Sequence, residues 1–260
     1  MRAVARVDRV TPTAVGLPEG TRACLFDLDG VLTDTARLHA AAWKQMFDPY
    51  LRRRAERRGD AFAPFDAVVD YDEYVDGRPR YEGVRTFLSS RGIDLPPGRW
   101  TDEPGIETIC GLGNLKNEIV LEMIRAVGAE PYPGSVRYVR AARAAGLACG
   151  VVSSSANCRD VLASTGLAAF FDARVDGLEA VRRHLRGKPA PDTYLAGAEI
   201  LGVTPGQTAI FEDALAGVAA ARAGRFGFVV GVDRTAQGPA LRAHGADVVV
   251  HDLEELLEGA

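Results

Sequence analysis

Short apolar runs recur along the chain, and each is followed by a turn of polar or glycine residues. The runs are ACLFDLD (23–29), ACGVVSS (148–154), TAIFED (208–213), GFVVGVD (227–233) and ADVVV (246–250). Continuous apolar runs of this length are typical of strands that are buried on both faces of a sheet. The pattern therefore predicts strands in these segments.

Alanine-rich stretches with helical character lie between most of these runs. They are SVRYVRAARAAG (135–146), CRDVLASTG (158–166), DTYLAGAEILG (192–202) and ALAGVAAARAG (214–224). Alternation of strands and helices predicts an α/β fold, a doubly wound parallel sheet of the Rossmann-like kind with helices on both faces. Such sheets place their sites at the carboxyl ends of the strands.

One block interrupts this alternation. Residues 36–130 carry little strand signal, and the connection between the first two strands is far longer than a crossover needs. The block contains an arginine-rich helix (50–59), a polar loop (70–83), and helices near 84–92 and 114–128. We expect an inserted helical domain at 36–130, a core domain formed by 1–35 and 131–260, and a hinge at EPYPG (130–134). The arginine run at 52–58 is interpreted as a solvated helix face.

Composition narrows the class of protein. The chain has 260 residues, of which 47% are hydrophobic and 25% charged, as in a soluble globular protein. Its net charge of −4 does not suggest a surface for nucleic acid. The first twenty residues lack the apolar stretch of a signal peptide, and no run reaches the length of a membrane span. The apolar surroundings of Cys24 and Cys149 favour reduced thiols and a cytoplasmic protein.

Chemically active side chains stand where the predicted strands end. Two carboxylates stand two positions apart at the end of the first run. Carboxylates this close to each other repel unless a cation or a proton neutralises the charge. A hydroxyl, an ammonium and a second pair of carboxylates follow further along the chain. In order, these residues are Asp27 with Asp29, Ser153, Lys188, and Glu212 with Asp213. Such a set suits Mg²⁺ together with a phosphoryl group.

Each signal also has a purely structural interpretation when it is taken alone. Asp27 and Asp29 could cap the following helix, and Glu212 with Asp213 could be stabilised by a helix dipole. Ser153 could be a turn residue and Lys188 a surface charge. The occurrence of all four signals in order, each at a predicted strand end, favours the functional interpretation.

The four motifs resemble those of the haloacid dehalogenase superfamily over nearly the whole chain. They are D-x-D-G-V-x-T at 27–33, the serine after the second strand, K-P-A-P-D at 188–192, and E-D-x-x-x-G at 212–217. Within the superfamily, the chain is most similar to the β-phosphoglucomutase group, which has a helical cap. FDLDGVLTDTARLHAAAWK (26–44), KNEIVLEMI (116–124), YPG (132–134) and VSSSAN (152–157) carry this resemblance.

The resemblance implies a mechanism on an aspartyl-phosphate. Asp27 would be the nucleophile, and Asp29 would act as general acid and base. Lys188 and Ser153 would stabilise the charge on the transferring oxygens. Mg²⁺ would be the cofactor. Its implied ligands are Asp27, Asp213 with Glu212, and the backbone carbonyl of Asp29.

The resemblance also implies that the cap recognises the substrate. Arg80 would grip a distal phosphate, Lys116 and Asn117 would contact the sugar, and His39 would link cap closure to the acid/base group. Arg80 could instead be a loop charge, and His39 could be a packed interfacial histidine. The polar loop at 70–83 departs from the group's usual pattern, because Pro79 precedes Arg80 and the segment after Asp70 is longer. Thr35, Ser155 and Asn157 complete the expected substrate-binding set.

The sequence favours a Mg²⁺-dependent phosphotransferase that converts β-glucose 1-phosphate to glucose 6-phosphate through a bisphosphate. The alternatives are a phosphatase on the same scaffold and, in another class, a phosphosugar-binding protein without catalysis. The catalytic motifs are common to mutase and phosphatase, so the cap residues alone favour the first. The expected partner is a small phosphorylated sugar, with no nucleic acid and no membrane, and the expected state is a monomer.

Overall fold

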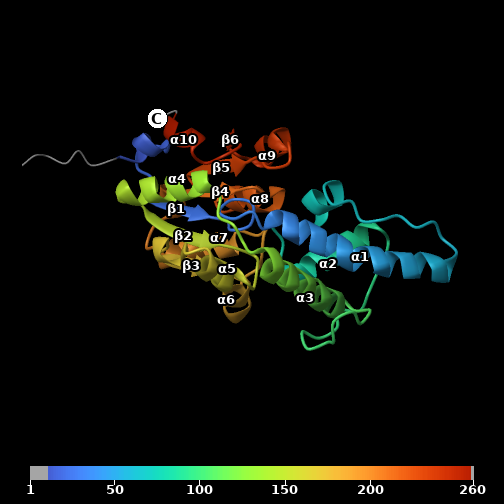
Figure 1. Cartoon of the computed structure of the whole chain (residues 1–260). Coiled ribbons are helices and arrows are strands. Elements are labelled where there is room, and N and C mark those ends of the chain that lie inside the picture. The colour runs from blue at the N-terminus through green and yellow to red at the C-terminus, as the bar shows by residue number, and fades with distance from the viewer. Residues whose placement is uncertain (1–10, 259–260) are drawn as a thin grey trace, which may run out of the picture.

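The protein is built on one parallel sheet, seen here in a computed structural model that describes residues 11–258 (Figure 1). The strands lie in the order β3-β2-β1-β4-β5-β6. Their bounds are Ala23–Phe26 (β1), Ala148–Val152 (β2), Ala173–Val175 (β3), Thr208–Glu212 (β4), Phe228–Val232 (β5) and Val248–Val250 (β6). The five predicted strands are confirmed, and β3 is one that the apolar pattern did not predict.

The central strand β1 lies between β2 and β4, so Cys24 is opposite both Cys149 and Ala209. Successive residues of a strand point to opposite faces. Phe26 therefore contributes to the hydrophobic core on one face of the sheet, and Leu25 contributes to the core on the other. This arrangement confirms the predicted doubly wound α/β fold.

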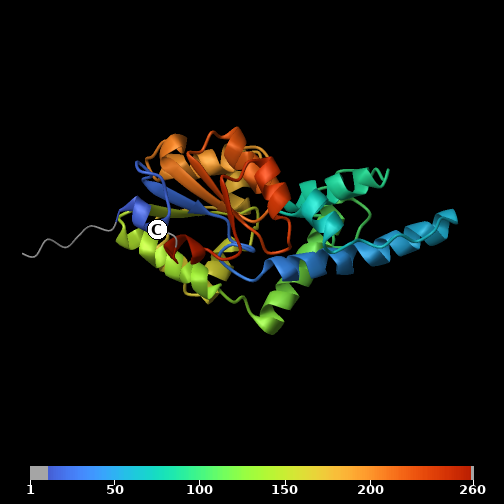
Figure 2. The ribbon, with the colours of Figure 1, turned by 90° about the horizontal axis from the view of Figure 1, so that it is seen from above.

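Helices cover both of these faces (Figures 1 and 2). On the Phe26 face the core includes residues from α4 (Pro133–Ala144), α5 (Cys158–Ser164) and α10 (Glu255–Glu258). On the Leu25 face it includes residues from α7 (Asp192–Ile200), α8 (Leu215–Ala223) and α9 (Gly238–His244). Short helices complete the core domain: the α-helix α6 (Gly177–Arg182) and the 3-10 helices η1 (Pro12–Val15), η3 (Ala168–Phe170) and η4 (Pro205–Gln207).

The block 36–130, which we call the cap, forms a helical body beside the sheet (Figure 2). Its elements are α1 (Ala36–Arg58), the π-helical turn η2 (Tyr71–Val75), α2 (Arg80–Ser90) and α3 (Ile109–Val127). They enclose a hydrophobic core separate from those of the sheet. At its centre the Phe47 ring lies 5.4 Å from Trp43, 5.3 Å from Phe65 and 4.3 Å from Phe87, measured between ring centroids.

The segment 70–83, predicted to be a loop, is partly helical. Tyr71–Val75 forms η2, and α2 begins at Arg80. The many polar residues of this segment suggested a loop, but the side chains of Tyr71 and Val75 are buried in the cap core. The irregular backbone is therefore limited to the few residues between η2 and α2, which we call the cap loop (residues 76–79).

The two connections between cap and core run side by side. The Asp34 N–H donates to the Glu130 carbonyl at 2.9 Å, and the Tyr132 N–H donates to the Leu32 carbonyl at 3.0 Å. The domain division 1–35 with 131–260 and 36–130 stays a prediction, and residues 1–10, 259 and 260 lie outside the described part. Within residues 11–258, no helix has both the length and the apolar character needed to cross a bilayer.

Candidate active site

The first motif forms a tight loop at the carboxyl end of β1. Asp27 continues the strand pairing, because its N–H donates to the Phe211 carbonyl at 2.9 Å. Gly30 closes the turn with φ of 81°, a conformation that glycine adopts without strain. A Cβ at Gly30 would overlap the Asp213 carboxylate. Glycine at this position thus lets the carboxylate that follows β4 approach the loop of Asp27.

A buried lysine joins the ends of β1 and β4. The Lys188 side chain is 1% exposed, and its Nζ pairs with the Asp27 carboxylate and, at 2.8 Å, with Glu212 Oε2. The Tyr194 hydroxyl donates to the same Glu212 oxygen. Burial by itself lowers the pKa of Lys188, but the two carboxylates outweigh burial and raise the pKa well above its usual value. Lys188 is therefore a fixed cation.

The carboxylates around Lys188 carry more negative charge than this one lysine can balance. Asp27, Glu212 and Asp213 each offer an oxygen, and these atoms lie within 4.8 Å of one another. Burial raises the pKa of Asp213 well above its usual value, and neighbouring carboxylates add to the effect. Burial also raises the pKa of Glu212, to about 7, although Lys188 opposes it. Three hard oxygen donors with surplus negative charge fit a divalent cation such as Mg²⁺.

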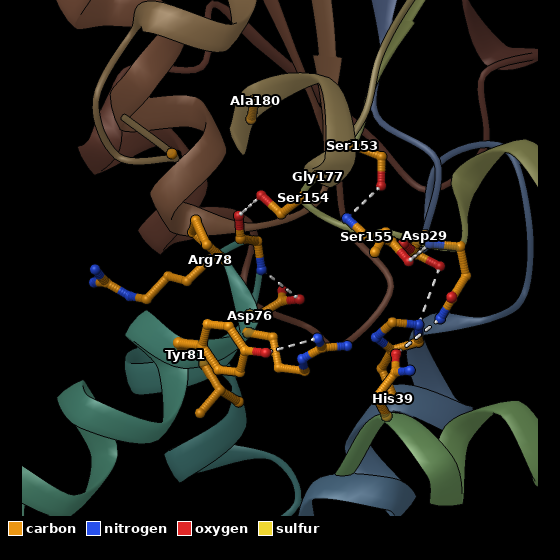
Figure 3. Close-up of a pocket in the computed structure, with 18 of the residues that line it drawn as sticks. Asp29, His39, Asp76, Arg78, Tyr81, Ser153, Ser154, Ser155, Gly177 and Ala180 are labelled. Carbon is orange, nitrogen blue, oxygen red and sulfur yellow. Dashed lines mark hydrogen bonds and ion pairs between the residues drawn. The ribbon is translucent and has the colours of Figure 1, made fainter. Parts of the chain in front are cut away.

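The second aspartate of the motif is held by residues from its own loop and from the cap. The Thr35 hydroxyl donates to Asp29 Oδ1 and lies 2.8 Å from the Thr33 hydroxyl. His39 Nε2, from α1, lies 3.6 Å from the same Asp29 oxygen (Figure 3). Thr35 was expected to bind substrate, but it is fully buried and does not line the cavity described below. Its hydroxyl orients Asp29 instead.

A lysine of the cap helix α3 contacts His39 on the side of the ring away from Asp29. Lys116 Nζ lies 3.0 Å from His39 Nδ1 and 4.9 Å from the centre of the Trp43 ring. Burial lowers the pKa of Lys116 to about 7, and burial together with the Lys116 charge lowers the pKa of His39 well below its usual value. When Lys116 donates to Nδ1, a neutral His39 carries its proton on Nε2, the ring nitrogen that lies nearer Asp29. A chain of polar groups thus leads from α3 to Asp29.

The loop after β2 contacts the cap at two places. The Ser154 hydroxyl donates to the Gly77 carbonyl at 2.7 Å (Figure 3). The Asn157 amide donates to Asn117 Oδ1 on α3 at 3.2 Å. Within this loop, the Ser155 N–H donates to the Ser153 hydroxyl at 3.0 Å. Ser153 is therefore held in place by its own loop, which also joins core and cap.

Arg78 of the cap loop and Arg80, the first residue of α2, line the cavity described below. Arg80 donates to the Tyr81 hydroxyl at 3.3 Å, and Tyr81 donates to Asn114 at 2.7 Å. Arg80 Nε is buried and has no hydrogen-bond partner among the described residues. Pro79 lies against Gly187, where any Cβ would overlap the proline ring. The cap loop is therefore pressed against the segment that carries Lys188.

Core and cap together enclose a cavity of about 410 Å³. Most of the predicted site residues line it, whereas Thr35, Lys188 and Glu212 lie behind its wall. The predicted residues on the wall are Asp27, Asp29, His39, Arg80, Lys116, Asn117, Ser153, Ser155, Asn157 and Asp213.

Three further residues belong to the site although no sequence pattern pointed to them. Asp76 and Arg78 line the cavity from the cap loop, and Tyr194 holds Glu212 from α7. Both cap-loop residues lie in the polar segment that contains Arg80, and no pattern distinguishes them from surface charges. Tyr194 is four residues beyond the K-P-A sequence, in a stretch that indicates only a helix.

The fold, the carboxylate cluster and the buried lysine beneath a helical cap define an enzyme of phosphate-ester chemistry. The family model described as haloacid dehalogenase-like hydrolase matches residues 21–225. The chain belongs to this family, as the four motifs predicted.

Relatives that match nearly the whole chain place it more narrowly within the family. It is 59% identical over 251 residues to a β-phosphoglucomutase of Mycobacterium tuberculosis, covering 95% of this chain and 96% of the relative. It is 32% identical to a β-phosphoglucomutase of Bacillus subtilis, covering 90% and 91%. The crystal structure of β-phosphoglucomutase from Clostridium difficile matches with a TM-score of 0.69 and 26% identity, covering 91% and 93%.

Proposed function

We propose that this enzyme is a β-phosphoglucomutase, which converts β-glucose 1-phosphate to glucose 6-phosphate through a bisphosphate intermediate. One observation carries the proposal beyond the family. The polar chain from Lys116 through His39 to Asp29 joins the cap to the residue expected to move protons. A phosphatase needs a working base whenever water is present, whereas a mutase gains from one that is aligned only when the cap is shut.

The transfer itself is assigned to the end of β1. Asp27 attacks the phosphorus of the bound phosphate ester and forms an aspartyl-phosphate, while Asp29 gives a proton to the departing sugar oxygen. In the return step Asp29 takes the proton from the hydroxyl that receives the phosphoryl group. Lys188 and Ser153 stabilise the negative charge on the transferring oxygens. Thr35 keeps Asp29 oriented for both steps.

Asp27, Asp213, Glu212 and the backbone carbonyl of Asp29 are the residues proposed to hold Mg²⁺. The bound cation would neutralise charge between the nucleophile and the phosphate and keep Asp27 ionised. Lys188 then balances the remaining charge of Asp27 and Glu212. This distribution explains why three carboxylates can meet at one place in the interior.

The rest of the cavity is proposed to bind the sugar and its second phosphate. Arg80 offers an unpaired Nε, suited to a phosphate that is not being transferred. Lys116 and Asn117 on α3, with Ser155 and Asn157 on the core, present donors and acceptors to the hydroxyls. Closure of the cap over this set excludes water from the phosphoenzyme. We also propose that the enzyme acts as a monomer in the cytoplasm.

The deciding experiment supplies β-glucose 1-phosphate, Mg²⁺ and a trace of glucose 1,6-bisphosphate, and measures glucose 6-phosphate and free phosphate together. We expect glucose 6-phosphate in large excess. His39→Ala should slow transfer to the sugar far more than it changes the leak to water, because Asp29 loses its link to the cap. Release of one free phosphate for each substrate consumed would mean that the enzyme is a phosphatase. Absence of turnover on every ester, with binding retained, would favour a non-catalytic phosphosugar-binding protein.

The metal proposal makes a separate prediction. Asp213→Ala removes a carboxylate from the cluster without removing the nucleophile, so the Mg²⁺ concentration for half-maximal activity should rise by about tenfold or more. Isothermal titration of the substrate-free protein with Mg²⁺ should show weaker binding as well. Asp172→Ala is a matched control, because Asp172 pairs with Arg143 and belongs neither to the carboxylate cluster nor to the residues that line the cavity. Full activity of the wild type in excess chelator would exclude a role for the metal.

A further inference from the structure

Asp76 is an acidic residue of the cavity that the mechanism above does not use. It directly follows η2, at the start of the cap loop, and its side chain lines the cavity with Asp29 and His39. In the view of Figure 3 it lies between Ser154 and Tyr81, with Asp29 and His39 on the other side of the site. The cap therefore brings a carboxyl group of its own to the space where the substrate binds.

This carboxyl group has spare hydrogen-bonding capacity. Asp76 Oδ1 accepts from the Gly77 N–H at 3.0 Å, and the Tyr71 side chain also forms a hydrogen bond to this carboxyl group. No lysine, arginine or histidine nitrogen in residues 11–258 forms an ion pair with Asp76. A carboxyl group can accept about four hydrogen bonds, so these two partners leave part of its capacity unused. A carboxyl group with unused acceptor capacity on a cavity wall is expected to bind a hydrogen-bond donor of the ligand.

The position of Asp76 is fixed by contacts on its carboxyl-terminal side. The Gly77 carbonyl accepts from Ser154, a Cβ at Gly77 would meet Ala214, and Pro79 lies against Gly187. These three contacts fall on the loop after β2, the segment after β4 and the segment that carries Lys188. Closing the cap thus sets Asp76 at a defined place relative to the catalytic residues.

Charge decides which part of a sugar phosphate Asp76 can contact. Burial raises the pKa of Asp76 to about 8; the hydrogen bond with Tyr71 opposes this rise, and the charges of Glu212, Asp72 and Asp27 add to it. A carboxyl group among carboxylates does not attract a phosphate. It also lies outside the group Asp27, Glu212 and Asp213 whose oxygens are close enough to share a cation. The remaining polar groups of the substrate are its hydroxyls, which can bond to a carboxyl group in either protonation state.

We propose that Asp76 is a specificity-determining residue that hydrogen-bonds one hydroxyl of the sugar ring when the cap is closed. This inference rests on the proposed function and adds to it a residue that selects the sugar. A site built to bond a hydroxyl rejects an analogue that lacks it, because its own polar group is then left unpaired.

The test measures kcat/KM on β-glucose 1-phosphate and on analogues that each lack one ring hydroxyl. Asp76→Ala should lower the value on the parent sugar by about 10- to 100-fold. The analogue that lacks the contacted hydroxyl should be poor for the wild type and should show no further loss with Asp76→Ala. Asp76→Asn keeps an acceptor for the Gly77 N–H, so its loss should be smaller and should vanish on the same analogue.

Asp72→Asn is the matched control, since Asp72 is a cap carboxylate that faces Thr235, 3.4 Å from its hydroxyl, and does not line the cavity. Its effect should be the same on every analogue. If Asp76→Ala does not fold, as judged by its melting temperature, the comparison of kcat/KM across the analogues is made with Asp76→Asn alone. An equal loss on all analogues, or a changed Mg²⁺ requirement, would overturn the assignment of Asp76. Failure of the wild type to convert β-glucose 1-phosphate would instead refute the proposed function.

Discussion

Replacing Asp27 with asparagine should reduce turnover by about 10⁴-fold or more, because an amide cannot form the acyl phosphate. The substitution changes a single atom at the end of β1 and leaves the backbone pairing to Phe211 in place. We therefore expect a folded protein with a cooperative melting transition. Initial rates on β-glucose 1-phosphate, measured beside the wild type, give the effect directly.

A labelling experiment separates the nucleophile from a merely structural aspartate. Acid quenching with radiolabelled bisphosphate should leave phosphate covalently attached to the wild type and none attached to Asp27→Asn. Asp34→Asn is a suitable control in the same loop, because Asp34 pairs with Arg37 at the surface. A rate for Asp27→Asn near that of the wild type would show that another residue forms the intermediate.

Loss of Lys188 should have the second large effect, on stability as well as on activity. Its Nζ is the cation that pairs with both Asp27 and Glu212, and the side chain is 1% exposed. Removing one partner from a buried ion pair typically costs about 3–5 kcal/mol. Lys188→Met keeps the apolar length of the side chain, so its free energy of unfolding should fall by about that amount. Urea unfolding without added metal is the measurement.

A second substitution checks the physical reason for this loss. Glu212→Gln removes one of the carboxylates that Lys188→Met leaves unpaired, so the double variant should recover part of the lost stability. The interaction term of the double-mutant cycle should then differ clearly from zero. Additive losses would mean that Lys188 stabilises the fold through packing alone.

The strands and their catalytic ends could be predicted because two physical demands coincide in the sequence. A strand covered on both faces must be apolar throughout, and the polar residues that follow it must lie at the edge where the strands end. Asp27, Ser153 and Glu212 each end or directly follow such a run. Strand β3 gave no such signal: it is three residues long and includes Arg174, which is exposed at the edge of the sheet.

The contacts between cap and core could not be predicted from the amino-acid sequence. Lys116 and His39 are far apart in sequence, and only the packing of α3 against α1 brings them together. Asp76 stands in a polar segment where any charged residue would look solvated, and its burial depends on the cap lying against the core. Tyr194 shows its role only through the hydroxyl bond to Glu212. Tertiary placement, rather than local preference, decided each case.

Two of the hydrogen bonds across the seam between cap and core bear on how long the enzyme stays shut. The bonds from Ser154 to Gly77 and from Asn157 to Asn117 join neutral groups. Each is worth a net of about 0.5–1.5 kcal/mol, so ordinary thermal motion breaks them readily. A ligand that spans both halves adds its own contacts to these and to the contact between His39 and Asp29, so it lengthens the dwell time of the closed state. In the proposed reaction the bisphosphate must turn end for end, and the weakness of these two bonds favours the brief opening that this needs.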